Sequence, residues 1–268
     1  MLRELTARHG IRPDRSLGQH FLADPNLARA LAREAGAAPH VRILEVGAGL
    51  GSLTVALAEA GAEVLAVELD RGLLPVLEEV VRGLPVRVIR EDALEADWQA
   101  VLGEGPWRMA SNLPYNVAVP VVMGLLERAP QVDPMVVMVQ REVGERLAAG
   151  PGEDAYGGVS LRMAYRAAVE VVRRVPPTVF WPQPQVESVV VRIVRRPPPV
   201  ATPPEILFRL VEEGFAQRRK TMANALVRLG YPRGRAEDAL RRAGLGERVR
   251  AEDLGLEEMA RLAEALER

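Results

Sequence analysis

The chain has 268 residues, of which 48% are hydrophobic, and a formal net charge of −1 at pH 7. That length accommodates one large domain and a smaller second one, each with a packed core. The near-neutral charge excludes a surface that is basic throughout, so a nucleic-acid contact has to come from local clusters. The absence of cysteine excludes disulfides, thiolate metal sites and a cysteine nucleophile.

The sequence shows no apolar segment of the kind that directs a protein into or across a membrane. The N-terminus carries no apolar signal core, and no run approaches the roughly 18 apolar residues that a membrane span needs. A chain without cysteine also fits a reducing compartment. We therefore expect a cytoplasmic protein with no membrane contact.

The first part of the chain predicts alternating helices and strands. Residues 12–22 are basic and irregular, and Asp24-Pro25 then marks a helix start, because an aspartate cap followed by proline is favoured there. Strands are expected at residues 41–46, 64–68, 86–89, 107–110 and 135–139, with helices at 53–60, 73–81, 117–126 and 142–148. The continuous Val, Ile and Leu runs indicate strands buried on both faces, as in a parallel sheet covered by helices on both sides.

The pattern changes after a glycine-rich loop at residues 150–158. We expect a helix at 159–167, strands at 169–172 and 189–194, a rigid proline loop at 176–184, a linker at 195–204, and helices at 205–215, 220–229, 236–243 and 256–266. The last two strands predict an antiparallel end of the sheet. The chain is thus expected to form a Rossmann-like α/β domain over residues 1–196 and a small all-α domain over residues 197–268.

A glycine-rich turn, Gly47-Ala48-Gly49-Leu50-Gly51, follows the first of the alternating strands. Glycines at such a corner let the backbone pass close to a ligand. Glu68 and Asp92 lie at the ends of the next two strands, where Glu68 can accept the ribose hydroxyls of an adenosine and Asp92 can meet the adenine amino group. Ligands bind at the carboxyl ends of strands in open α/β sheets, so these features predict a cofactor that carries a nucleoside. They do not separate NAD from S-adenosylmethionine, and an ordinary strand–turn–helix corner is the alternative.

The tetrapeptide Asn112-Leu113-Pro114-Tyr115 follows the strand at residues 107–110. The Asn112 side-chain oxygen and the Leu113 carbonyl suit the two N–H groups of an exocyclic aromatic amine, and Tyr115 suits stacking on its ring. Such bonds would turn the amine lone pair toward an electrophilic methyl group, so placement and electrostatics would suffice without a strong base. Phe180 is the candidate for the opposite face of the ring. Taken singly, these residues also have structural explanations as a helix cap, packing or core.

Two basic clusters are candidates for RNA phosphates. One is Gln217–Thr221, which contains Arg218, Arg219 and Lys220 and is expected to open a C-terminal helix; the other includes Arg12 and Arg15. An ordinary solvated face explains the first cluster equally well, because glutamates lie nearby.

Six segments resemble the bacterial small-subunit rRNA adenine N6,N6-dimethyltransferases over nearly the whole chain. They are residues 16–22, 45–51, 67–70, 112–115, 179–186 and 215–221. The resemblance implies S-adenosylmethionine contacts at His20, Leu22, Gly47, Glu68, Asp92 and Asn112. It also implies acceptor-adenine contacts at Asn112, Leu113, Tyr115 and Phe180. The family usually has Asn where this chain has His20, and histidine can still donate a hydrogen bond there.

The resemblance implies a methyltransferase that modifies N6 of two adjacent adenosines, twice each, in a hairpin loop near the 3′ end of 16S rRNA. We expect its partner to be 16S rRNA or the immature small ribosomal subunit, and we expect a monomer without metal. Three alternatives stay open: a large-subunit rRNA adenine methylase, a ribosome-assembly factor that only binds RNA, and a nicotinamide-dependent dehydrogenase. The intact tetrapeptide speaks against binding alone, and no hydride-transfer acid is evident.

Overall fold

The computed structural model describes residues 2–13 and 18–267. The chain divides into two compact units. The first consists of Met1–Gly144 with Glu170–Arg195, and the second of Glu145–Val169 with Arg196–Arg268. The second unit therefore takes in a segment from the middle of the chain as well as the C-terminal residues.

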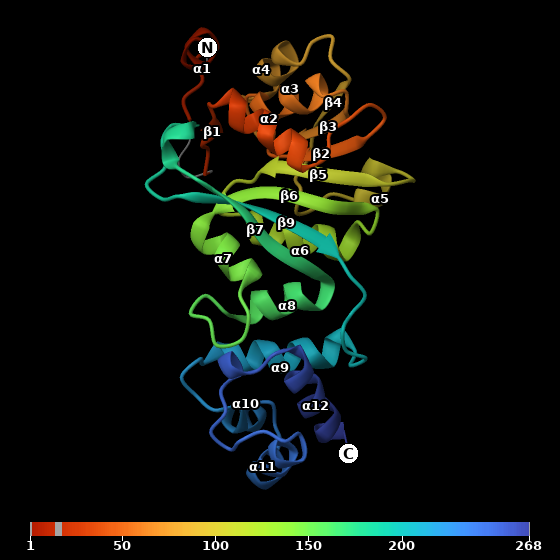
Figure 1. Cartoon of the computed structure of the whole chain (residues 1–268), viewed down its shortest axis with the longest axis vertical. Helices are drawn as coiled ribbons and strands as arrows, with labels where there is room; N and C mark the ends of the chain where they lie inside the picture. The colour runs from red at the N-terminus through yellow and green to blue at the C-terminus, as the bar shows by residue number, and fades with distance from the viewer. Residues whose placement is uncertain (1, 14–17, 268) are drawn as a thin grey trace. The chain divides into compact units, whose positions relative to one another are not determined.

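The first unit is built on a seven-stranded sheet with the order β4-β3-β2-β5-β6-β9-β7 (Figure 1). The strands are β2 (Arg42–Val46), β3 (Glu63–Glu68), β4 (Val86–Arg90), β5 (Trp107–Asn112), β6 (Val132–Gln140), β7 (Ala167–Val175) and β9 (Ser188–Arg195). Neighbours from β4 through β6 are parallel, whereas β9 runs antiparallel to β6. The predicted, mostly parallel sheet with an antiparallel end is confirmed.

Helices pack against this sheet through apolar faces. They are α2 (Pro25–Glu34), α3 (Ser52–Glu59), α4 (Leu74–Val80), α5 (Trp98–Leu102) and α6 (Ala118–Arg128). The helix α7 (Arg141–Ala148) begins in the first unit and ends in the second. Leu31 of α2 and Leu57 of α3 belong to one buried cluster with Ile43 of β2. The predicted start of α2 is confirmed, because the Asp24 carboxylate accepts hydrogen bonds from the backbone N–H groups of Asn26 and Leu27 at 2.7 and 3.3 Å.

Several short elements were not expected from the sequence. They are α1 (Leu2–Arg8), α5, β1 (Phe21–Leu22), β8 (Phe180–Trp181) and the 3₁₀ turn η2 (Pro177–Val179). The segments expected to be irregular thus contain two strands that pair antiparallel with each other, Phe21 opposite Trp181 and Leu22 opposite Phe180. This ladder ties the start of the chain to the proline-rich loop.

The second unit is helical and has its own core. Its helices are α8 (Gly158–Arg166), α9 (Pro204–Ala216), α10 (Met222–Arg228), α11 (Arg233–Arg242), the 3₁₀ turn η3 (Ala251–Asp253) and α12 (Leu256–Glu267). Figure 1 shows α9 to α12 in blue, and Leu207, Leu226, Leu240 and Leu262 from these four helices meet in one buried cluster. Residues 217–221 precede α10 rather than opening it, which corrects the sequence expectation. Among the described residues, no helix combines the length and apolar character of a membrane span.

Candidate active site

A cavity of about 400 Å³ lies in the first unit, lined by segments that follow β2, β3, β4 and β5. All six predicted cofactor contacts line it: His20, Leu22, Gly47, Glu68, Asp92 and Asn112. Three of the four predicted acceptor contacts line it as well: Asn112, Leu113 and Tyr115. The structure therefore brings together residues that are distant in the sequence at the carboxyl ends of parallel strands, where open α/β sheets bind ligands.

The glycine turn after β2 is shaped by backbone conformations that favour glycine. Gly47, Gly49 and Gly51 have φ values of 73°, 57° and 82°, in the left-handed region. A Cβ atom on Gly47 would lie 3.0 Å from Cδ of Pro114, and one on Gly49 would lie 3.1 Å from the Phe21 ring. The turn consequently packs directly against the tetrapeptide, so the two predicted motifs share one cavity wall.

The Glu68 carboxylate accepts hydrogen bonds from three backbone N–H groups beside the cavity. Its Oε2 accepts a hydrogen bond from Gly49 N at 2.8 Å, and its Oε1 accepts two, from Leu69 N and Asp70 N, at 2.9 Å each. Burial raises the pKa of this carboxyl, and the three backbone N–H groups partly offset that rise. Each carboxylate oxygen has about two lone-pair sites, so Glu68 keeps capacity for a ligand hydroxyl.

Asn112, the last residue of β5, presents its amide with a defined orientation. Its Nδ2 donates a hydrogen bond to the His20 carbonyl at 2.9 Å. Its Oδ1 has no hydrogen-bond partner among the residues that the structure describes, and the side chain lines the cavity. The next peptide is held by Leu113 N, which donates to the Met138 carbonyl at 3.1 Å. The amide oxygen is thus the acceptor left for a ligand.

Tyr115 is held at its hydroxyl and against one neighbouring ring. Its Oη lies 2.9 Å from the Ser188 hydroxyl, and burial raises the pKa of the phenol. The His20 ring lies 5.3 Å from the Tyr115 ring between centroids, tilted by 31°. His20 is itself bonded through Nδ1 to the Pro182 carbonyl at 2.7 Å.

Phe180 is the predicted acceptor contact whose surroundings differ from those of the other three. Its side chain is 4% exposed and belongs to the buried cluster that contains Leu22 and Leu27. It is not among the residues that line the cavity. The stacking role expected for Phe180 therefore stays a prediction.

The sequence reading assigned no role to Glu45, which also lines the cavity. Its side chain is 1% exposed, and Oε2 has no hydrogen-bond partner within the described part of the chain. Burial, with a contribution from the charge of Glu68, raises the pKa of Glu45 to about 8. The available signal was a carboxylate between the apolar residues Leu44 and Val46 of β2, just before the glycine turn.

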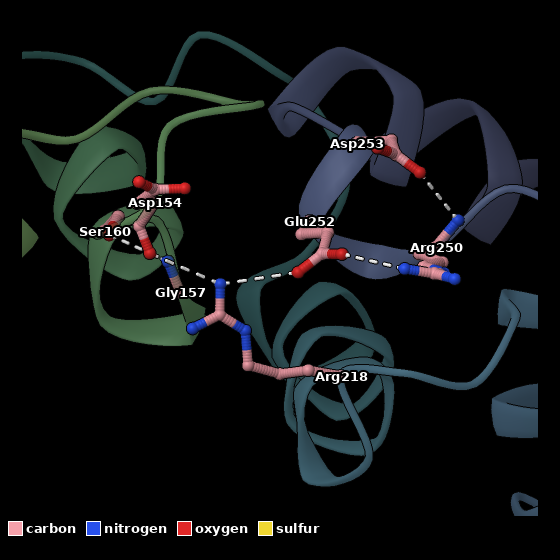
Figure 2. A network of polar contacts seen from close by, with 7 residues as sticks. All are labelled: Asp154, Gly157, Ser160, Arg218, Arg250, Glu252 and Asp253. Atoms are coloured by element: carbon pink, nitrogen blue, oxygen red, sulfur yellow. Dashed lines mark hydrogen bonds and ion pairs between the residues drawn. The ribbon is translucent and has the colours of Figure 1, made fainter.

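The predicted RNA contacts in the second unit differ in their partners. Figure 2 shows Glu252 between two arginines, with Arg218 3.3 Å from Oε2 and Arg250 3.4 Å from Oε1. Arg218 also donates to the Asp154 carbonyl at 3.4 Å. The side chains of Arg219 and Lys220 are exposed and make no ion pair with another described residue.

The other predicted RNA contacts belong to the N-terminal segment. Arg12 is exposed in the first unit. Arg15 lies outside the described residues. Both assignments therefore rest on the sequence.

Comparisons with known proteins place the chain in a family. Residues 11–268 match the family described as "Ribosomal RNA adenine dimethylase". The chain is 44% identical to the ribosomal RNA small subunit methyltransferase A of Kineococcus radiotolerans, over 98% of this chain and 89% of that protein. The crystal structure of the 23S rRNA methyltransferase ErmE superposes with a TM-score of 0.70 at 28% identity, covering 92% of this chain and all of that one.

A dimethyladenosine transferase from Plasmodium falciparum shares the fold, with a TM-score of 0.76 at 22% identity over 91% of this chain and 96% of that one. The sequence match and the structural matches each cover more than nine tenths of this chain. The chain belongs to the ribosomal RNA adenine dimethylase family.

Proposed function

We propose that this chain transfers methyl groups from S-adenosylmethionine to N6 of two adjacent adenosines in a hairpin loop near the 3′ end of 16S rRNA. The products are N6,N6-dimethyladenosines, made during assembly of the small ribosomal subunit. The observation that carries the proposal is the Asn112 amide. It lines the cavity with Nδ2 bonded to the His20 carbonyl, and its Oδ1 has no hydrogen-bond partner among the described residues.

The cavity residues fit S-adenosylmethionine. The glycine turn lines the cavity with backbone that packs closely on Pro114 and Phe21, and Glu68 retains acceptor capacity for a ribose hydroxyl. Asp92 accepts from Leu94 N at 2.9 Å, which fixes its carboxylate beside the cavity for the adenine amino group. His20 and Leu22 supply the wall from β1 and the residue before it. The cofactor, when bound, supplies a methyl group on a positively charged sulfur.

The acceptor residues place an adenine amine without a strong base. Asn112 Oδ1 and the Leu113 carbonyl accept its two N–H groups and turn the nitrogen lone pair out of conjugation with the ring. Tyr115 stacks on the base, as enzymes do with bases taken out of a helix. Attack of the neutral amine on the methyl carbon would break the carbon–sulfur bond and leave an uncharged thioether. The positive charge would pass to the nitrogen and be lost as a proton to water, so positioning and electrostatics carry the acceleration.

RNA phosphates are bound by local basic groups. Arg219 and Lys220 supply exposed cations that form no ion pair with a described carboxylate, and Arg218 joins them when it leaves Glu252. Arg12 and Arg15 add contacts from the N-terminal segment. The protein acts in the cytoplasm as a monomer and needs no metal, since no step calls for a Lewis acid.

The test is mass spectrometry of rRNA digests after incubation of the protein with isotope-labelled S-adenosylmethionine and immature small subunits. The expected product is N6,N6-dimethyladenosine at two adjacent positions, and primer extension on both subunit RNAs locates it. Label in large-subunit RNA alone would reassign the chain to the large-subunit class. RNA binding without any label would leave only an assembly role, and binding of NAD instead of S-adenosylmethionine would indicate a dehydrogenase.

A further inference from the structure

We propose that Ser188 is a positioning residue for the acceptor pocket: its hydroxyl fixes the Tyr115 ring against which the target base is placed. The inference rests on the proposed function, because it assumes that Tyr115 contacts the acceptor. It concerns a residue outside the tetrapeptide, on a strand that does not line the cavity.

The location of Tyr115 explains why it needs such a restraint. The residue lies in the turn between β5 and α6 rather than inside either element, and its side chain is half-buried. The cavity occupies part of its surroundings. A ring that borders an open cavity keeps one orientation only when other contacts determine it.

Ser188 is suited to provide that contact. It is the first residue of β9 and pairs with Gln140 of β6, which fixes its backbone in the sheet. Its side chain is fully buried, and its only hydrogen bond to a described side chain is the 2.9 Å bond to Tyr115 Oη. A buried hydroxyl is costly to leave unpaired, so serine and tyrosine hold each other.

A second contact limits the remaining freedom of the ring. The His20 ring lies 5.3 Å from the Tyr115 ring, and the bond from His20 to the Pro182 carbonyl anchors it. The hydroxyl bond fixes the far end of Tyr115, and His20 restricts its tilt. Catalysis that depends on placement is sensitive to this restraint, because small shifts of a reacting group reduce rate strongly.

The test compares Ser188→Ala, Tyr115→Phe and the double variant in steady-state methylation of immature small subunits. Each change removes one end of the same bond and keeps the Tyr115 ring. We expect kcat to fall by about threefold to tenfold in all three proteins, the range that corresponds to one hydrogen bond. The double variant should be no worse than either single variant, because the two residues act as one unit. The Kd for S-adenosylmethionine, measured by calorimetry, should stay within twofold of the wild type.

Ser160→Ala is the matched control, because Ser160 is another buried serine with a bonded hydroxyl, accepting from Gly157 N at 3.1 Å (Figure 2). It lies in the second unit and lines no part of the cavity. We expect Ser160→Ala to lower the thermal midpoint while kcat remains at the wild-type value. Ser188→Ala leaves the Tyr115 hydroxyl without its partner, whereas the double variant leaves no unpaired hydroxyl. If Ser188→Ala therefore does not fold, the kcat of the double variant is compared with that of Tyr115→Phe.

Three results would overturn the inference: an unchanged kcat in Ser188→Ala, additive losses in the double variant, or a loss of cofactor affinity that matches the loss of rate. Tyr115→Ala separates this failure from failure of the proposed site. A large loss of kcat in Tyr115→Ala with a normal Ser188→Ala would remove only the role of Ser188. A normal kcat in Tyr115→Ala would remove the acceptor assignment itself.

Discussion

The buried carboxyl of Glu45 makes the stability of the first unit depend on pH, and Glu45→Gln isolates that effect. Burial raises the pKa of Glu45 from 4.5 to about 8, so the folded chain holds a proton that the unfolded chain releases above pH 4.5. The sign follows from this difference. The stabilisation is complete below pH 4.5 and is lost as the pH rises toward 8.

The magnitude follows from the same two pKa values. Each pH unit between them costs about 1.4 kcal/mol, so the free energy of unfolding should fall by about 4 kcal/mol between pH 5 and pH 8 through this residue. Glutamine keeps the neutral shape of the side chain and cannot ionise. The Glu45→Gln variant should therefore lack this fall and become the more stable protein at alkaline pH.

The assay is urea unfolding at several pH values between 5 and 9, followed by tryptophan fluorescence. All three tryptophans, Trp98, Trp107 and Trp181, belong to the first unit and report on it. Glu63→Gln removes an exposed carboxylate from the neighbouring strand and controls for the loss of one charge. A difference between the wild type and Glu45→Gln that stays constant from pH 5 to pH 9 would refute the reasoning.

Three further predictions follow from the site and the basic surface. Asn112→Ala should lower kcat by about 10²- to 10³-fold, the loss expected when a transition-state contact is removed. Calorimetry should still detect cofactor binding in this variant. Methyl transfer at the wild-type rate would contradict the acceptor assignment. Gly47→Ala should destabilise the first unit by about 1–2 kcal/mol in urea unfolding, because φ of residue 47 is 73° and the new Cβ would lie 3.0 Å from Pro114. The same change should weaken S-adenosylmethionine binding. An unchanged affinity would show that the turn does not shape the cofactor site. Replacing Arg219 and Lys220 together by alanine should make the plot of log K for RNA binding against log salt concentration less steep by about 1.4, because each phosphate contact contributes roughly 0.7. An unchanged slope would exclude both residues as phosphate contacts.

The sequence predicted those features that depend on local chemistry. The Asp24–Pro25 start of α2, the buried parallel strands and the glycine turn are each encoded by neighbouring residues, and the structure confirms them. The cavity could also be anticipated, because parallel strands bring their carboxyl ends to one edge. That rule predicts that Glu68, Asp92 and Asn112 lie together, and all three line the cavity.

Other features depend on partners that are far away in the chain, and local patterns do not report them. The strands β1 and β8 have two residues each and exist only as a pair, so neither segment shows a periodicity of its own. The orientation of Asn112 follows from this pairing, because the His20 carbonyl that receives its amide directly precedes β1. Charges counted along the sequence likewise do not reveal that Arg218 pairs with Glu252, which lies 34 residues away.

The three backbone hydrogen bonds to Glu68 reduce the conformational entropy that the protein loses when a ligand binds. One side chain joins the turn after β2 to the end of β3, so both loops are ordered before any ligand arrives. Binding to a preorganised wall loses little conformational freedom of the backbone, and most of the contact free energy remains as affinity. Replacing Glu68 would therefore do more than delete an acceptor for the ribose: it would convert a rigid receptor into one that has to order two loops around each incoming ligand.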